Sequence, residues 1–132
     1  MTTEFSIADK LFKGIESKDT ESLKALYSDD VKIWHNFTNA EQTKEQNLAV
    51  LENMCKAVPH IKYEILERHM VEGRVLQRHN LRCETSTGEK FLIPACMFMT
   101  IRGNQISRIE EYLDSGQANA LRLASGREPL TS

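Results

Sequence analysis

The chain has 132 residues, of which 40% are hydrophobic and 27% are charged, with 17 Lys and Arg against 19 Asp and Glu. This length suits one domain with its own core and is short for two, and the composition excludes a disordered chain. The net charge of −2, without clustered Lys and Arg, argues against a face that binds nucleic acid. We expect a single domain over residues 1–132.

The sequence carries no sign of export or of membrane insertion. The first ten residues include Glu4 and Asp9 and lack the apolar run of a signal peptide, and no stretch reaches the ~20 apolar residues of a membrane span. Cys55, Cys83 and Cys96 are odd in number and form no CxxC pair, which is typical of reduced thiols. We therefore expect a cytoplasmic protein that contacts no membrane.

The first part of the chain predicts two helices, a strand and a third helix. Apolar residues recur at spacings of three and four and share one helix face: Phe5, Ala8, Phe12 and Ile15. Asp19 can cap a short second helix, and Val31–Phe37 holds the β-formers of a strand, followed by a loop over residues 39–42. Thr43 opens a capping box at the start of the third helix, and Pro59 marks its end.

From residue 61 to residue 114 the chain predicts antiparallel strands joined by turns. Ile61–Ile65 alternates apolar with polar residues, as a half-buried strand does. The segment Phe91–Ile101 is apolar at both parities, which predicts a central strand buried on both faces. Helices first and strands later indicate an α+β fold, with the helices on one face of a curved sheet around an apolar pocket. The tail from Gly116 predicts a short helix and then a loose end.

The last strand carries the main candidate for chemistry. Its sequence sets Glu111 between Ile109 and Leu113 on one face, which is the pattern of a face turned toward an apolar interior. Loss of hydration there favours the protonated form of a carboxylate and makes it useful as a general base or acid. The alternative is that this carboxylate faces a dimer partner or pairs with an arginine, and both interpretations stay open.

Two other strands carry polar side chains whose direction decides the site. In the strand Arg74–Glu84, apolarity favours the face of Gln77, His79, Leu81 and Cys83 as the buried face. In the early strand, Trp34 and Asn36 share one face, whereas Ile33, His35 and Phe37 share the other. A buried Asn36 needs hydrogen-bond partners and is a candidate for orienting a water molecule or a carbonyl group.

With these residues in view, the whole chain resembles the nuclear-transport-factor-2-like superfamily, especially its SnoaL-like, ketosteroid-isomerase-like and limonene-epoxide-hydrolase-like members. The order helix, helix, strand, helix and sheet matches over residues 5–115, with residues 116–132 as a tail. The sequence Ile109-Glu110-Glu111-Tyr112-Leu113-Asp114 is similar to the last-strand motif of the superfamily. The resemblance implies an α+β, cystatin-like roll, in which a cone-shaped antiparallel or mixed sheet wraps around N-terminal helices.

The epoxide hydrolases of the superfamily give the sharpest comparison. Their Tyr-x-Asn, Arg-x-Asp and last-strand Asp look like Trp34-His35-Asn36, Arg78-His79-Asn80 and Glu111. The resemblance implies that Glu111 deprotonates a water molecule, that Asn36 orients it and that Arg78 holds the acidic group. It also places Arg78 and Asn80 inward, against the face that apolarity favours. However, the Asn80 amide cannot donate a catalytic proton, and the Trp34 indole cannot accept a hydrogen bond, so epoxide hydrolysis is disfavoured.

These departures favour proton transfer at carbon, in which Glu111 moves the proton while Arg78 and Asn80 stabilise an enolate oxygen. We therefore expect an isomerase or aldol cyclase that acts on a small, largely apolar carbonyl compound. The alternative is a non-catalytic module for ligand binding or dimerisation. The pocket is expected to be lined by Trp34, Leu76, Ile93, Ala95, Ile109 and Leu113.

The expected partners are a small apolar molecule and a second copy of the chain. A sheet face that carries Tyr112, Leu81 or Phe98 on the outside would leave apolar area for a homodimer. The four histidines show no HxH, HxxH or HExxH spacing, and no Cys joins them. The chain also lacks phosphate-loop and nucleophile motifs, so we expect neither a metal nor a cofactor.

Overall fold

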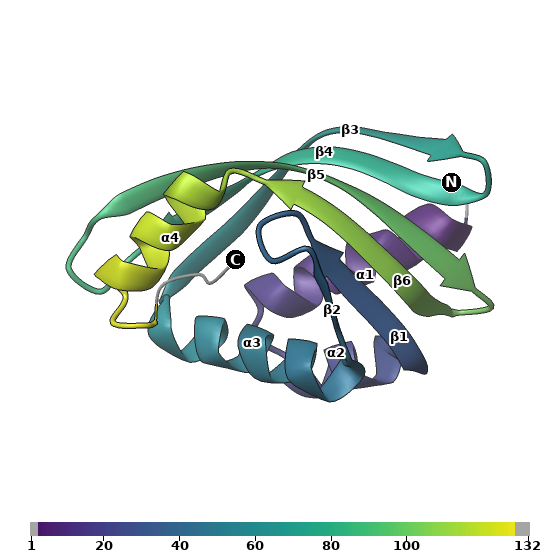
Figure 1. The fold of residues 1–132 in the computed structure, drawn as a ribbon, viewed down its shortest axis with the longest axis horizontal. Coiled ribbons are helices and arrows are strands. Elements are labelled where there is room, and N and C mark those ends of the chain that lie inside the picture. Colours follow the sequence, from purple (N-terminus) through teal and green to yellow (C-terminus); the bar gives the residue numbers. More distant parts are fainter. Residues whose placement is uncertain (1–2, 129–132) are drawn as a thin grey trace.

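Six strands form one curved sheet that arches over three helices in the computed structural model, which describes residues 3–128 (Figure 1). The elements are α1 Thr3–Glu16, α2 Thr20–Leu26, β1 Tyr27–His35, β2 Ala40–Gln42, α3 Lys44–Ala57, β3 His60–Val71, β4 Arg74–Glu84, β5 Lys90–Arg102, β6 Gln105–Leu113 and α4 Ser115–Ala124. The sheet order is β2-β1-β6-β5-β4-β3. Only β1 and β6 are parallel; the other neighbours are antiparallel. The expected α+β fold with a curved mixed sheet is confirmed.

Local sequence signals explain where the helices begin. The Asp19 carboxylate accepts a hydrogen bond from the Ser22 amide at 3.1 Å and starts α2. At α3, Thr43 and Gln46 form the expected reciprocal capping box, which satisfies two amides that the helix leaves unpaired. The helix α1 buries one apolar face, as its spacing predicts.

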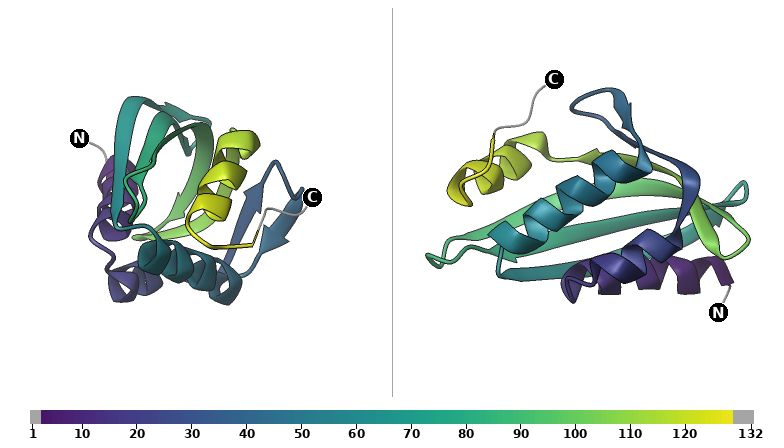
Figure 2. Two further views of the ribbon diagram at one scale, coloured as in Figure 1. Left: turned by 90° about the vertical axis from the view of Figure 1, so that its left-hand side faces the viewer. Right: turned by 90° about the horizontal axis from the view of Figure 1, so that it is seen from below.

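The helices are distributed so that the concave face of the sheet becomes the interior. The helix α1 packs on β3, β4 and β5, whereas α3 packs on β1 and β2, and α4 lies against β5. Figure 2 shows the sheet curling around this interior, with α3 and α4 on the side away from α1. The hydrophobic core lies between α1, α2 and the concave face. Its members on β5 alternate as pleating requires: Ile93, Met97 and Met99. On β6, Ile106 and Ile109 are both buried because the register with β5 shifts between them.

Three details differ from the sequence-based expectations. The strand β1 begins at Tyr27, earlier than expected, and residues 40–42 of the expected loop pair with β1. The prediction that β5 is buried on both faces is wrong, because Leu92 is exposed and Phe98 is only half-buried on the outer face. No helix among residues 3–128 covers that face or has the length and apolar character to cross a membrane. The expected short helix after residue 115 is confirmed as α4, and residues 129–132 of the expected loose end lie outside the described part.

A β-bulge in β3 turns one charged side chain into the interior. Ile65 pairs with His79, whereas Glu67 pairs with Arg78, so Leu66 is an extra residue opposite β4. An extra residue reverses the parity of the strand beyond it. Arg68 consequently lies on the concave face, beside α1.

Candidate functional site

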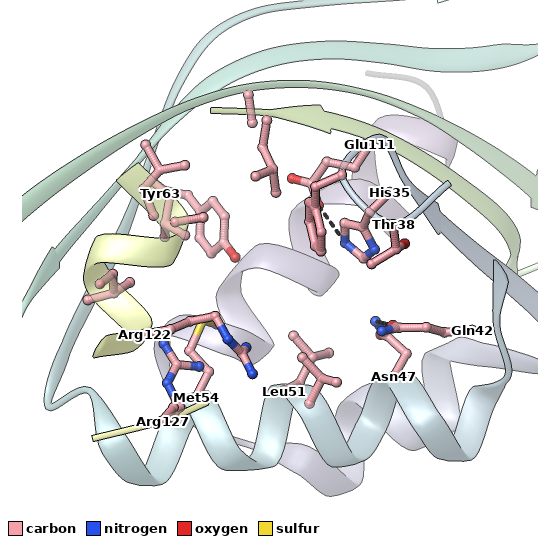
Figure 3. Close-up of a pocket in the computed structure, with 18 residues that line it drawn as sticks. His35, Thr38, Gln42, Asn47, Leu51, Met54, Tyr63, Glu111, Arg122 and Arg127 are labelled. Carbon is pink, nitrogen blue, oxygen red and sulfur yellow. Dashed lines mark hydrogen bonds and ion pairs between the residues drawn. The ribbon is translucent and has the colours of Figure 1, made fainter. Parts of the chain in front are cut away.

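A cavity of about 260 Å³ lies between the concave face of the sheet, α3 and α4 (Figure 3). Its wall is largely apolar: Phe37, Val50, Leu51, Met54, Leu81, Ile93, Ala95, Leu113, Ala118 and Leu121. A smaller number of polar side chains interrupt it: His35, Thr38, Gln42, Asn47, Tyr63, Glu111, Arg122 and Arg127. An apolar cavity with a few convergent polar groups is the usual form of a site for a small ligand.

One row of side chains crosses the concave face and brings the polar groups together. In this row His35 of β1 pairs with Glu111 of β6, Glu111 with Met97 of β5, Met97 with Gln77 of β4, and Gln77 with Arg68 of β3. Residues in register on neighbouring strands point to the same side of a sheet. The row therefore places one carboxylate, one imidazole, one amide and one guanidinium on the inner face.

Glu111 lies between two imidazoles. Its Oε1 atom is 3.2 Å from Nε2 of His35, and its Oε2 atom is 3.8 Å from Nε2 of His79. The Glu111 side chain retains 16% of its exposure, and it faces the cavity, whereas His79 lies behind it. The carboxylate is thus the group that a ligand in the cavity can touch.

A fixed chain of hydrogen bonds assigns the proton of His79. Arg68 donates to Oε1 of Gln77 through Nε at 2.9 Å and through Nη2 at 2.6 Å. Since a guanidinium can only donate, this end of the Gln77 amide must be its oxygen. The amide nitrogen then donates to Nδ1 of His79 at 2.9 Å, which leaves the ring proton on Nε2, the atom that faces Glu111.

Burial keeps His79 neutral. The side chain is 1% exposed, and its ring packs 5.3 Å from the rings of Phe12 and Tyr63. Desolvation lowers the pKa of His79, and the Arg68 charge adds to that effect, while the Glu111 charge opposes it. Within residues 3–128, Nε2 of His79 is buried without a hydrogen-bond partner, so its N–H is free to follow small movements of the Glu111 carboxylate.

The far end of this chain is anchored on α1. Nη1 of Arg68 donates to Oδ1 of Asp9 at 2.7 Å and to the Phe5 carbonyl at 3.3 Å. The guanidinium lies mostly buried, and its five donors have fixed directions, so it holds the Gln77 amide in one orientation. We refer to Asp9, Arg68, Gln77 and His79 as the relay.

Tyr63 contributes a hydroxyl group to the cavity. Figure 3 shows its ring on the sheet side with the oxygen pointing into the cavity. Burial raises the pKa of Tyr63 well above its usual value, and the Glu111 charge raises it further. The phenol therefore stays protonated at neutral pH and can donate a hydrogen bond.

Four of the residues expected at the site line the cavity: Glu111, Ile93, Ala95 and Leu113. Ile109 lies on the same inner face but is packed in the core rather than at the cavity wall. The roles of these residues stay predictions at this point, because their positions alone assign no chemistry.

The inward placement of Arg78 and Asn80 is wrong. Nε of Arg78 donates to Glu67 at 2.7 Å, and Nδ2 of Asn80 donates to Glu64 at 2.9 Å, both on the outer face. Strand alternation gives the inner positions of β4 to Gln77, His79 and Leu81, which is the face that apolarity favours. Leu76 shares the outer parity and does not line the cavity, whereas Leu81, expected outside, does.

Trp34 and Asn36 also lie away from the cavity. The ring of Trp34 meets the ring of Tyr112 edge-on at 5.1 Å on the outer face. The Asn36 amide accepts from the Leu113 amide at 3.1 Å and donates to the Leu113 carbonyl at 3.3 Å, so it prolongs the pairing between the ends of β1 and β6. Neither residue lines the cavity.

The inner positions missed by the sequence analysis follow from strand parity. Val31 and Ile33 are buried, and two residues further along β1 the same face carries His35. On β4, buried Val75 and Cys83 define the face of His79 in the same way. By contrast, no sequence pattern predicts that Arg122 and Arg127, in the C-terminal segment, line the cavity.

Comparisons with known proteins agree with this architecture. The family of SnoaL-like domains matches residues 8–109, whereas no curated protein matches the chain. IdmH, a proposed polyketide cyclase from Streptomyces antibioticus, is 16% identical with a TM-score of 0.79, covering 91% of this chain and 98% of IdmH.

Two further solved structures are similar in fold. PrhC from Penicillium brasilianum is 17% identical with a TM-score of 0.81, covering 94% of this chain and 91% of PrhC. An LEH-like epoxide hydrolase from M. tuberculosis is 13% identical with a TM-score of 0.75, covering 93% and 91% of the two chains. At these identities the likeness shows the nuclear-transport-factor-2-like fold and no particular reaction. The match over most of its length shows that this chain belongs to the family of SnoaL-like domains.

Proposed function

We propose that this protein is a cytoplasmic, single-domain enzyme that moves a proton at carbon without a cofactor. Its substrate would be a small, largely apolar carbonyl compound, and its reaction an isomerisation or an aldol-type ring closure. The observation that carries this proposal is the position of the Glu111 carboxylate. It faces an apolar cavity, and a neutral imidazole whose proton is fixed on Nε2 lies behind it.

The geometry supports Glu111 as the base. A carboxylate that removes a proton from carbon must be exposed to the ligand but shielded from bulk water, and Glu111 is the only carboxylate among the described residues that line the cavity. The N–H of His79 can approach the carboxylate from behind and fix its orientation without blocking the face toward the ligand. In this proposal His79 is a positioning residue, and Glu111 is the catalytic residue.

A donor for the developing enolate oxygen lies on the same cavity wall. The Tyr63 hydroxyl points into the cavity, and the His35 ring lines it beside Glu111 (Figure 3). Donors placed where negative charge develops lower the barrier of such reactions, typically by a few kcal/mol. We assign to the Tyr63 hydroxyl the role first expected for Arg78 and Asn80, whereas Nε2 of His35 contacts Glu111 itself.

A non-catalytic ligand-binding module is the second candidate. The observation that favours it is the 3.2 Å contact between Glu111 and His35, because a charged His35 would hold the carboxylate in an ion pair and weaken it as a base. Conversion of Glu111 to Gln separates the two functions. The enzyme proposal expects turnover of carbonyl substrates to disappear while ligand affinity stays nearly unchanged; a ligand retained by both forms, with no chemistry in either, would leave only the binding module.

We also propose that the protein forms a homodimer through the outer face of the sheet. Tyr112 is 50% exposed there, and Leu66 is 42% exposed, although both are large apolar side chains. Such area on a sheet face that no described helix covers commonly meets a second copy of the same chain. Sedimentation at high concentration tests this, and a monomer throughout would refute it.

A further inference from the structure

Two arginines from the C-terminal segment line the same cavity as Glu111. Arg122 belongs to α4, and Arg127 follows that helix. Figure 3 shows their guanidinium groups together beside Met54 of α3, across the cavity from Glu111 and His35. The cavity therefore has a carboxylate at one end and two cations at the other.

These two arginines differ from the other arginines in that no carboxylate among residues 3–128 pairs with them. The sequence has eight arginines. Six of them lie within ion-pair distance of a carboxylate: Arg68, Arg74, Arg78, Arg82, Arg102 and Arg108. Across residues 3–128, no Asp or Glu oxygen comes within 4.0 Å of a side-chain nitrogen of Arg122 or Arg127.

Most of their hydrogen-bonding capacity is also unused by the part of the chain described. Nε of Arg122 donates to the Glu128 carbonyl at 2.7 Å, and Nε of Arg127 donates to Oγ of Ser125 at 3.0 Å. These two bonds fix the guanidinium planes and leave the terminal nitrogens available. A guanidinium held in this way presents parallel N–H donors that match the two oxygens of a carboxylate.

The placement of the pair is unfavourable without an anion. Burial lowers the pKa of Arg127, and the neighbouring Arg122 charge lowers it further. Because an arginine remains charged at neutral pH, two like charges stand together against an apolar wall, where their hydration is reduced. An oxyanion between them would replace the missing hydration and offset their repulsion.

We propose that Arg122 and Arg127 bind the carboxylate of a ligand whose remaining part is apolar. The carbonyl group at the Glu111 end of the ligand rests on the proposed function. With it, the substrate class is a carbonyl compound that carries a carboxylate at its far end. The arginine pair orients the molecule, and the carbon that loses its proton then lies beside Glu111. Binding of the carboxylate itself requires no chemistry at Glu111.

The test uses neutral and charged probes of equal shape. Arylalkanoic and straight-chain acids, such as 4-phenylbutanoate, are compared with their amides by isothermal titration calorimetry. The unmodified protein is expected to bind at least one acid roughly tenfold or more tightly than its amide, as charge-assisted hydrogen bonds allow. Arg122→Gln and Arg127→Gln are each expected to reduce this preference, and the double variant to abolish it.

The controls separate this inference from its alternatives. Arg82→Gln, which removes an arginine paired with Glu64 on the outer face, is expected to keep the acid preference, and thermal unfolding checks that every variant is folded. Glu111→Gln is also expected to keep the preference, so a loss of chemistry with retained preference contradicts only the proposed function. If no acid in the panel binds more tightly than its amide, or if the double variant keeps the preference, the carboxylate site is refuted.

Discussion

The side-chain nitrogen of Gln77 lies 2.9 Å from Nδ1 of His79, and this hydrogen bond determines which ring nitrogen carries the proton. The amide cannot turn over, because Arg68 donates twice to its oxygen. A neutral imidazole with its N–H toward Glu111 is the result. Through the relay, the ion pair of Asp9 with Arg68 thus fixes the Gln77 amide, and the amide fixes the proton of His79 on the nitrogen next to Glu111.

Replacement of Gln77 by Glu tests this relationship. A carboxylate at residue 77 can only accept from His79, so the ring proton is expected to move to Nδ1, or the ring to become charged. Nitrogen-15 spectra of the labelled ring distinguish these forms. The unmodified protein should show a protonated Nε2 and an unprotonated Nδ1. Spectra that are the same in both proteins would mean that Gln77 does not control the proton.

The lowered pKa of His79 predicts how stability depends on pH. Between the folded-state pKa and the unfolded value of 6.5, the unfolded chain binds more protons, so the free energy of unfolding falls as the pH falls below about 6.5. His79→Gln should remove this part of the fall. Urea unfolding at pH 7.5 and 5.5 measures it, with His69→Gln as a control because that imidazole is exposed. Equal pH dependence in all three proteins would contradict a neutral buried His79.

Arg68 and Arg78 form a matched pair for stability, because they lie on opposite faces of the same two strands. The Arg68 side chain is 12% exposed, and its removal leaves Asp9 and the Gln77 oxygen without their donor. Arg68→Gln is expected to cost about 2–4 kcal/mol. Arg78→Gln removes an exposed pair with Glu67 and should cost at most about 0.5–1 kcal/mol. Chemical denaturation measures both free energies of unfolding. A loss for Arg68→Gln as small as the loss expected for Arg78→Gln would show that the relay adds no stability.

The cysteines are expected to differ in reactivity. Burial raises the pKa of Cys83 to about 11 and also raises the pKa of Cys55, so few thiolates form at pH 8, and the buried sulfurs are shielded. Burial also raises the pKa of Cys96, but this thiol is only half-buried, on the outer face, so reagent access distinguishes it from the other two. Mass spectrometry after brief alkylation should find Cys96 modified first and Cys83 only on unfolding. Early modification of Cys83 would show that the core opens locally.

Much of the fold follows from local patterns in the sequence. The capping box at Thr43 and the helical spacing from Phe5 to Ile15 depend on neighbours in the chain, so they identify α3 and α1 without tertiary information. Glu111 was placed inward because Ile109 and Leu113 flank it on one parity. The same reasoning on β4 favours the face of Gln77 and His79, which is the buried face in the structure, whereas the resemblance to the epoxide hydrolases implies the opposite face and is wrong for this strand.

The rest of the site depends on tertiary structure. The bulge at Leu66 brings Arg68 inward, but the β3 sequence has no glycine or other local signal of an extra residue there. Arg122 and Arg127 reach the cavity only because α4 folds back toward β5. The sequence of β5 predicts burial on both faces, because local composition does not indicate whether another element covers the outer face.

The central claim is that Glu111 moves a proton at carbon, and exchange in deuterium oxide tests it most directly. Apolar ketones and keto acids are incubated with the protein, and deuterium uptake next to the carbonyl is followed by proton NMR. Glu110→Gln is the matched control, since Glu110 adjoins Glu111 but pairs with Arg74 on the outer face. We predict catalysed exchange in the unmodified protein and in Glu110→Gln, and a loss of at least roughly 10²-fold in Glu111→Gln. Exchange that is unchanged in Glu111→Gln, or absent from the unmodified protein across the panel, would contradict the claim.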